Sequence, residues 1–125
     1  MFNYLVDYEM ADNYFEKLKI KMDEYVHFVY KLTKGFPREE IYGVISQLRR
    51  AALSVILNYI EGFARQKKAV KSNFWEIAYG SLKESKYLLH FSLVENYLKE
   101  GDYKKAMELA DEIGAMLWKC LQSLK

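Results

Sequence analysis

The sequence predicts an all-α protein, an up-down-up-down four-helix bundle that forms a single domain over residues 1–125. Just over half of the 125 residues are apolar or aromatic. The chain has only one proline and six glycines, so it is poor in the turn residues that a many-stranded sheet needs. Apolar residues also recur at alternating steps of three and four along four stretches, which is the spacing that places them on one face of a helix.

The first helix is expected at about residues 12–33, after a lead-in over residues 1–11. Asp12 is a favourable N-cap residue, and Gly35 is a stop signal after the last apolar position. The apolar face of this helix consists of Phe15, Leu18, Met22, Tyr25, Val29 and Leu32.

The second helix is expected at about residues 38–66, with Pro37 at its start, where a missing N–H costs nothing. Its apolar seam has coiled-coil spacing and consists of Ile41, Ile45, Leu48, Ala52, Val55 and Tyr59. A polar stripe runs along another face at steps of three and four, through Gln47, Arg50, Ser54, Asn58, Glu61 and Arg65. Because apolar side chains flank this stripe on both sides, we expect the helix to be covered on nearly all sides.

The third and fourth helices are expected at about residues 70–99 and 102–124. Gly101 is predicted to end the third helix as a C′ glycine, and Asp102 to cap the fourth. A hairpin of the second and third helices would set the polar stripe against a strip of small residues around Ser81. Glu84 would then lie within reach of Arg50.

Two interpretations of the polar stripe remain open. It could be a groove for a ligand or partner, or a buried hydrogen-bond network that sets the register of two helices. We favour the network, because buried polar groups are costly without partners. Its predicted members are Gln47, Arg50, Ser54, Asn58, Glu61 and Glu84. Glu61 and Arg65 could also simply pair with each other, at i and i+4.

No stretch of the sequence predicts a catalytic or metal site. Glu24 and His27 form one E-x-x-H unit, but a di-iron carboxylate site needs a second unit, and Tyr87 stands where His90 would need its glutamate. Cys120 lies among leucines and is expected to be a small buried residue rather than a nucleophile. Phosphate loops and zinc spacings are missing too, so we expect a non-enzyme without a cofactor.

Basic residues gather where the second helix is expected to end. They could contact a nucleic-acid backbone, with neighbouring aromatic rings as stacking surfaces, or they could form a solvated helix end. The net charge of +2 does not decide between these alternatives. The candidate nucleic-acid residues are Arg49, Arg65, Lys67, Lys68 and Lys71.

Three apolar side chains of the second helix exceed what the core of a four-helix bundle requires. They are Leu53, Leu57 and Ile60, and exposed apolar area of this kind marks an interface. The lead-in or a neighbouring helix could cover them instead. We favour a homo-oligomer with the second helix at the subunit contacts.

The sequence favours a soluble, cytoplasmic protein. A single cysteine excludes an internal disulfide and fits a reducing compartment. The first ten residues lack the features of a signal peptide, and no window approaches the roughly 20 apolar residues of a membrane span. No membrane association is therefore expected.

Two segments, FPREEIYGVISQLRRAALSVILNYIEGFARQ and FWEIAYGSLKESKYLL, resemble the bacterial four-helix-bundle proteins encoded in intervening sequences of 23S rRNA genes. The resemblance covers most of the chain from about Phe15 onward. Departures from the family pattern are Val44 for leucine, Ile56 where proline is common, and Ser85 for a larger apolar residue. The matching residues are Phe36, Pro37, Glu40, Tyr42, Gln47, Leu48, Arg49, Arg50, Ala51, Ser54, Asn58, Glu61, Gly62, Phe74, Ile77, Ala78, Gly80, Ser81, Leu82 and Glu84.

The resemblance implies a ring-like homo-oligomer, commonly a pentamer. It also implies similarity in fold to the accessory variability determinant of diversity-generating retroelements. That protein is a basic pentameric barrel that binds nucleic acid and a reverse transcriptase. The expected partners are therefore further copies of the chain, RNA or DNA, and a reverse transcriptase. The alternative is a structural or protein-binding oligomer with no nucleic-acid role.

Overall fold

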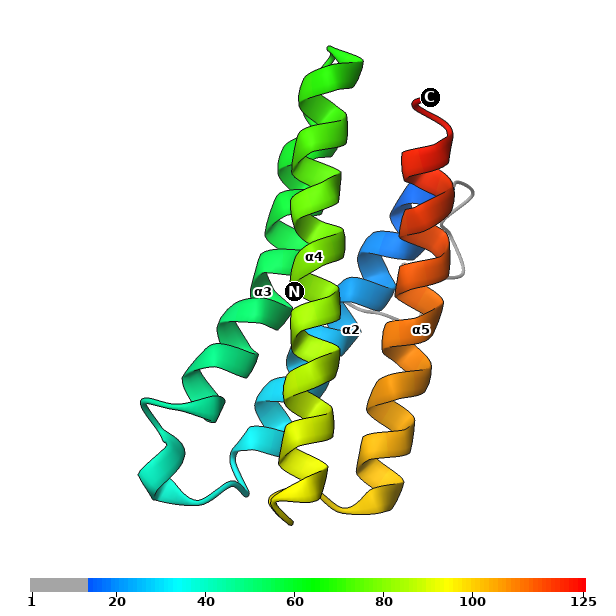
Figure 1. Ribbon diagram of the computed structural model, residues 1–125. Coiled ribbons are helices and arrows are strands. Elements are labelled where there is room, and N and C mark those ends of the chain that lie inside the picture. The colour runs from blue at the N-terminus through cyan, green and yellow to red at the C-terminus, as the bar shows by residue number, and fades with distance from the viewer. Residues whose placement is uncertain (1–13) are drawn as a thin grey trace.

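The computed structural model describes residues 14–125, which form four long α-helices that run alternately up and down (Figure 1). Helices α2 and α4 run in one direction and α3 and α5 in the other, and each helix packs against two neighbours. No strand occurs in this part of the chain, which confirms the all-α prediction. Asp12 and the lead-in over residues 1–11 lie outside the described residues. The helices are α2 (Tyr14–Thr33), α3 (Val44–Phe63), α4 (Lys68–Val94) and α5 (Glu100–Gln122).

The second helix begins later than predicted. A short 3-10 helix, η1 (Arg38–Glu40), follows Pro37, and α3 begins only at Val44. The helical conformation is interrupted at Gly43, whose φ of −110° and ψ of −116° are not helical. The Glu40 carboxylate accepts a hydrogen bond from the Val44 N–H at 3.3 Å, and a Cβ atom at Gly43 would collide with that carboxylate. Ile41 consequently leaves the predicted seam and is 53% exposed.

The third helix ends at Val94 rather than near Lys99. Asn96 has a φ of 63°, the left-handed conformation that asparagine tolerates better than most residues. Its N–H donates to the Leu93 carbonyl at 3.0 Å, and the N–H of Tyr97 donates to the Ser92 carbonyl at 2.9 Å. This pair of bonds is a Schellman motif with Asn96 at C′.

Gly101 and Asp102 therefore do not have the predicted capping roles. Both lie in the first turn of α5, whose N-cap is Lys99. The connection is fixed instead by Tyr97, which packs on Phe36 and donates a hydrogen bond to the Glu40 carboxylate at 2.8 Å. This hydrogen bond raises the pKa of Tyr97 to about 12.

The core lies where the apolar faces of the four helices meet. The predicted α3 seam is buried except for Ile41. A hydrogen bond of 2.7 Å joins Tyr25 of α2 to Ser85 of α4 through this core. Because the single hydroxyl proton of Ser85 is donated to the Leu82 carbonyl at 2.7 Å, Tyr25 is the donor to Ser85. Burial raises the pKa of Tyr25 to about 12.

Helices α3 and α4 make a close contact at Gly62 and Trp75. The Trp75 side chain is only 1% exposed, and its indole N–H donates to the Tyr59 carbonyl at 3.0 Å. A Cβ atom at Gly62 would lie 2.5 Å from Trp75 Cδ1. Glycine at this position therefore allows the indole to lie against the α3 backbone. The Tyr59 hydroxyl in turn donates to the Phe15 carbonyl at 2.9 Å, which ties α2 to the same hairpin.

Candidate interaction surfaces

Three surfaces of the α3–α4 hairpin contain most of the residues singled out from the sequence: a polar cleft, an apolar row and a basic end. The polar cleft lies between the two helices and has a volume of about 310 Å³. It is lined by Gln47, Arg50, Ala51, Ser54, Ser81 and Glu84.

A short hydrogen-bonded ladder forms the inner wall of the polar cleft. The hydroxyls of Ser54 and Ser81 lie 2.8 Å apart, joining α3 to α4. Asn58 Nδ2 donates to both the carbonyl and the hydroxyl of Ser54, each at 2.9 Å. The helix-joining network expected from the sequence thus exists at these three residues.

The other predicted members of the network are exposed in the single chain, so a fully buried network is not what one chain forms. These residues are Gln47, Arg50, Glu61 and Glu84. Arg50 and Glu84 line the polar cleft from opposite helices, whereas Glu61 pairs with Arg65 at 2.8 Å. The i,i+4 pairing considered from the sequence is therefore confirmed.

The apolar row consists of Leu53, Leu57 and Ile60, which lie on one face of α3. Their side chains are 37%, 54% and 45% exposed, and no helix within residues 14–125 covers them. Ile77 of α4 is 45% exposed as well. A cover by the lead-in, the alternative considered from the sequence, falls outside the described residues. The hairpin therefore presents leucine and isoleucine side chains to its surroundings.

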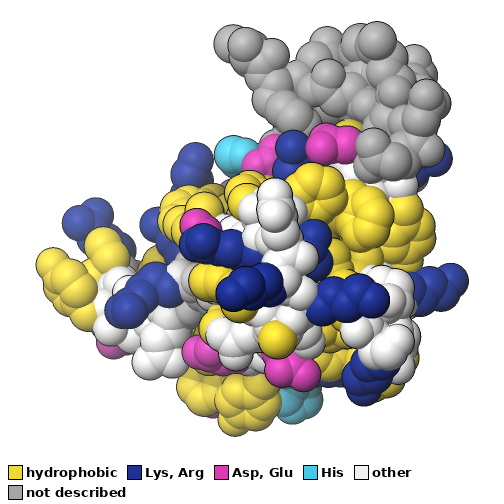
Figure 2. All heavy atoms as spheres, turned by 90° about the horizontal axis from the view of Figure 1, so that it is seen from above, with side chains coloured by type: hydrophobic (Ala, Val, Ile, Leu, Met, Phe, Trp, Pro, Cys, Tyr) yellow, Lys and Arg dark blue, Asp and Glu magenta, His cyan; other side chains and the backbone are white. Residues whose placement is uncertain are grey.

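The basic end is the turn between α3 and α4, and Figure 2 views the molecule from this end, with Lys and Arg side chains spread over it. Arg65, Lys67 and Lys68 are exposed, and neither lysine has an ion-pair partner within the described part of the chain. Lys71 is half-buried, with its Nζ 5.3 Å from the centre of the Trp75 ring. The Arg65 guanidinium lies 5.4 Å from the centre of the Phe74 ring. Cations and aromatic rings thus meet at this end.

Arg49 does not belong to the basic end. Its Nε donates to the Thr33 hydroxyl at 2.8 Å, and its guanidinium lies 4.6 Å from the centre of the Tyr30 ring. These contacts join α2 to α3 about four turns away from Arg65 along the chain. The structure thus separates Arg49 from the other four candidate nucleic-acid residues.

The remaining chemical candidates lie apart from one another. His27 is largely exposed and lies 3.4 Å from the Asp23 carboxylate. Within residues 14–125, no three side chains of His, Cys, Asp or Glu converge in a way that could hold a metal ion. Cys120 is buried, and burial raises the pKa of its thiol to about 11. Among the helices of residues 14–125, none has the length and apolar character that a membrane span requires.

A further groove was not predicted from the sequence. It lies between α4 and α5, has a volume of about 330 Å³, and includes Tyr79, Lys83 and Trp118. Tyr79, Lys83 and Lys86 lie at i, i+4 and i+7, so they share a face of α4. That spacing was a signal for a second polar and aromatic face on this helix.

The fold and these surfaces define a class of protein: an antiparallel four-helix bundle whose outer helix faces carry apolar, polar and basic surfaces. Within that class, the chain belongs to the 23S rRNA-intervening sequence protein family, whose sequence profile matches residues 17–119. The resemblance noted from the sequence is thereby confirmed. No curated protein has significant sequence similarity to the chain.

A crystal structure from Bacteroides thetaiotaomicron has the same fold. It is described as a protein of unknown function from the S23 ribosomal protein family. The two chains are 21% identical and superpose with a TM-score of 0.75, over 83% of this chain and 97% of the other. At this identity, the similarity supports the bundle architecture alone.

Proposed function

We propose that this protein is a non-enzymatic, homo-oligomeric binding protein whose copies associate through the outer face of the α3–α4 hairpin. The observation that carries the proposal is the apolar row, Leu53, Leu57 and Ile60, which is well exposed in the single chain. A surface helix usually turns such residues inward, and a row of exposed ones marks a protein interface.

The polar cleft beside this row supports association with copies of the same chain. Arg50 and Glu84 have opposite charges and lie on one face, so a second copy can offer each of them a partner. The family resemblance favours a closed ring, and five copies of the 14.8 kDa chain is the expected size.

The test is the mass in solution of Leu57→Glu, measured by size-exclusion chromatography with light scattering. Leu57 is 54% exposed, so the substitution leaves the core intact but places a carboxylate in the proposed interface. We expect a helical protein with the mass of one chain. Trp118→Glu is the matched control, because Trp118 is 50% exposed but lies on α5, and it should keep the parent mass. If Leu57→Glu also keeps the parent mass, the proposed interface is wrong.

The second proposed activity is binding of RNA or DNA at the basic end. Two lysines without ion-pair partners within residues 14–125, Lys67 and Lys68, beside cation–aromatic contacts, support it. The resemblance to retroelement accessory proteins adds a reverse transcriptase as a candidate partner. Co-purification with a reverse transcriptase encoded beside the gene would test that partner.

Fluorescence anisotropy with single-stranded RNA and DNA at increasing salt tests the nucleic-acid proposal. The double variant Lys67→Gln/Lys68→Gln should bind more weakly, with a salt slope smaller by about 1.4–1.8, because each phosphate contact contributes about 0.7–0.9. The matched control is Lys31→Gln/Lys34→Gln, two exposed lysines at the end of α2, which should bind as the parent does. Equal binding by both variants would contradict a site at Lys67 and Lys68. No binding at all by the parent favours the alternative of an oligomer with no nucleic-acid role.

A further inference from the structure

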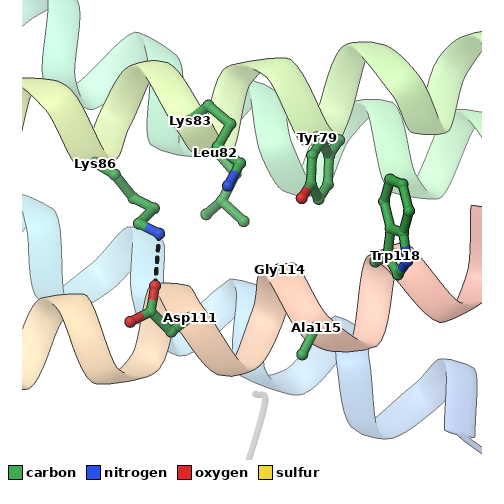
Figure 3. A pocket seen from close by; sticks show the side chains of 8 residues that line it. All are labelled: Tyr79, Leu82, Lys83, Lys86, Asp111, Gly114, Ala115 and Trp118. Carbon is green, nitrogen blue, oxygen red and sulfur yellow. Dashed lines mark ion pairs between the residues drawn. The ribbon is translucent and has the colours of Figure 1, made fainter.

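The groove between α4 and α5 has two aromatic walls (Figure 3). Tyr79 extends from α4 and Trp118 from α5, with ring centroids 5.8 Å apart and ring planes inclined by 45°. Trp118 is 50% exposed, although tryptophan has more apolar surface to bury than any other side chain. Half of this ring is therefore open to contact by another planar group.

Two lysines of α4 also line the groove. Lys86 forms an ion pair with Asp111, drawn as a dashed line in Figure 3, so its charge is balanced within the chain. Lys83 is exposed, has no carboxylate partner within residues 14–125, and holds its Nζ 5.2 Å from the centre of the Tyr79 ring. The groove thus carries one uncompensated positive charge directly beside its aromatic walls.

Small residues keep the floor of the groove open. Gly114 and Ala115 of α5 lie between the aromatic pair and the ion pair. A Cβ atom at Gly114 would come within 3.4 Å of a methyl group of Leu82, so a side chain here would fill the space between the helices. The cavity of about 330 Å³ is at the lower end of the range for small-molecule sites.

We propose that this groove binds one nucleotide unit, with the base against Trp118 and Tyr79 and the phosphate at Lys83. A base is a planar ring that stacks on aromatic side chains, and a phosphate complements a lysine without a partner. The unit can be a free mononucleotide or one residue of a single strand. The groove lies on α4 and α5, away from the apolar row and the basic end, so this inference does not rest on the proposed function.

The two tryptophans of the chain provide the test. The full-length protein is labelled with 5-fluorotryptophan and followed by fluorine NMR while AMP, UMP or a six-nucleotide RNA is added. We expect the Trp118 resonance to shift with saturation. The chemical shift of Trp75 should not change, because that ring is buried and its N–H already donates a hydrogen bond to the Tyr59 carbonyl.

Three variants test the contacts. Lys83→Gln should weaken binding about tenfold through loss of a charge-assisted bond. Ala115→Leu, at an exposed position of the floor, should abolish the shift by filling the groove. Lys31→Gln changes an exposed lysine on α2 and should bind as the parent does.

Each outcome decides a point. A shift with AMP or UMP supports a free nucleotide, and a shift with the RNA alone supports a unit of a strand. No shift with any of the three ligands at millimolar concentration overturns the inference. An unchanged response in Lys83→Gln and Ala115→Leu also overturns it. If Lys67→Gln/Lys68→Gln keeps the Trp118 shift but loses strand binding, the groove and the basic end act separately.

Discussion

Replacing Gly62 by alanine tests how α3 and α4 are held together. The new methyl group would lie 2.5 Å from Trp75 Cδ1, 2.6 Å from Trp75 Nε1 and 3.1 Å from the Lys71 carbonyl oxygen. The indole is fully buried and hydrogen-bonded, so it has no open space into which to move. Either the two helices separate or Trp75 abandons its bond to the Tyr59 carbonyl.

The expected cost follows from three contributions. Overpacking a close contact costs about 1–3 kcal/mol, and weakening the indole hydrogen bond costs about 1 kcal/mol. The higher helix propensity of alanine stabilises the folded state by about 1 kcal/mol and offsets part of this cost. We therefore expect Gly62→Ala to destabilise the protein by about 2 kcal/mol, which lowers the urea midpoint by about 1 M.

Gly80→Ala is the matched control for this prediction. Gly80 lies within α4, and a Cβ atom there would meet no atom within 4 Å. Only the propensity gain applies, so this variant should be more stable than the parent by about 0.5–1 kcal/mol. Urea unfolding followed by circular dichroism at 222 nm measures both. The close-approach reasoning is refuted if Gly62→Ala is as stable as the parent or as Gly80→Ala.

Three further predictions concern the core and a helix end. Tyr25→Phe should lower the free energy of unfolding by about 1 kcal/mol, because Ser85 keeps its bond to the Leu82 carbonyl. Ser85→Ala should lower it more, because the buried tyrosine hydroxyl is left without its partner. The reverse order in urea unfolding would contradict the assignment of Tyr25 as the donor. Burial raises the pKa of Cys120 to about 11 and that of Tyr25 to about 12, so the folded state holds these two protons more tightly than the unfolded state does. The free energy of unfolding should therefore be unchanged below about pH 9 and should fall between pH 9 and 12. A Cys120→Ala variant should lose part of that decline, and a stability that rises over this range would contradict the assignment. Asn96→Ala should lower the free energy of unfolding by about 1 kcal/mol and Asn96→Gly should leave it unchanged, since only alanine is strained at a φ of 63°. Equal urea midpoints for the two variants would contradict the role of this left-handed residue.

The long helices and their buried faces follow from the sequence. The three-four spacing identified the inner residues of α3 from Ile45 to Tyr59, and small residues such as Ser81 indicated where α4 approaches. Such patterns are repeated over many turns, so local exceptions do not hide them.

The helix ends were harder to predict, because each depends on one conformation. Gly101 is the conventional stop signal, yet Asn96 takes the left-handed position five residues earlier and Tyr97 packs on Phe36. Gly43 similarly interrupts the helix predicted to begin after Pro37, because its backbone is not helical and the Glu40 carboxylate accepts the Val44 N–H instead. The contacts of Tyr97 with Phe36 and Glu40 are tertiary, and no local pattern contains them.

The candidate surfaces were predicted in part. Exposure of Leu53, Leu57 and Ile60 agrees with their predicted position beside the polar stripe and away from the seam. The place of Arg49 apart from the basic end could not be predicted, because its partners Thr33 and Tyr30 are far away in sequence. The α4–α5 groove could not be predicted for the same reason, since Trp118 and Tyr79 meet only in the folded chain.

Sedimentation velocity of the unmodified protein over a hundredfold dilution tests the central claim most directly. If the apolar row of α3 is an interface between copies, the main species must be a discrete multiple of 14.8 kDa, and five copies is the size expected from the family resemblance. A single species of 14.8 kDa at every concentration, with Leu57 accessible to solvent, would contradict the account.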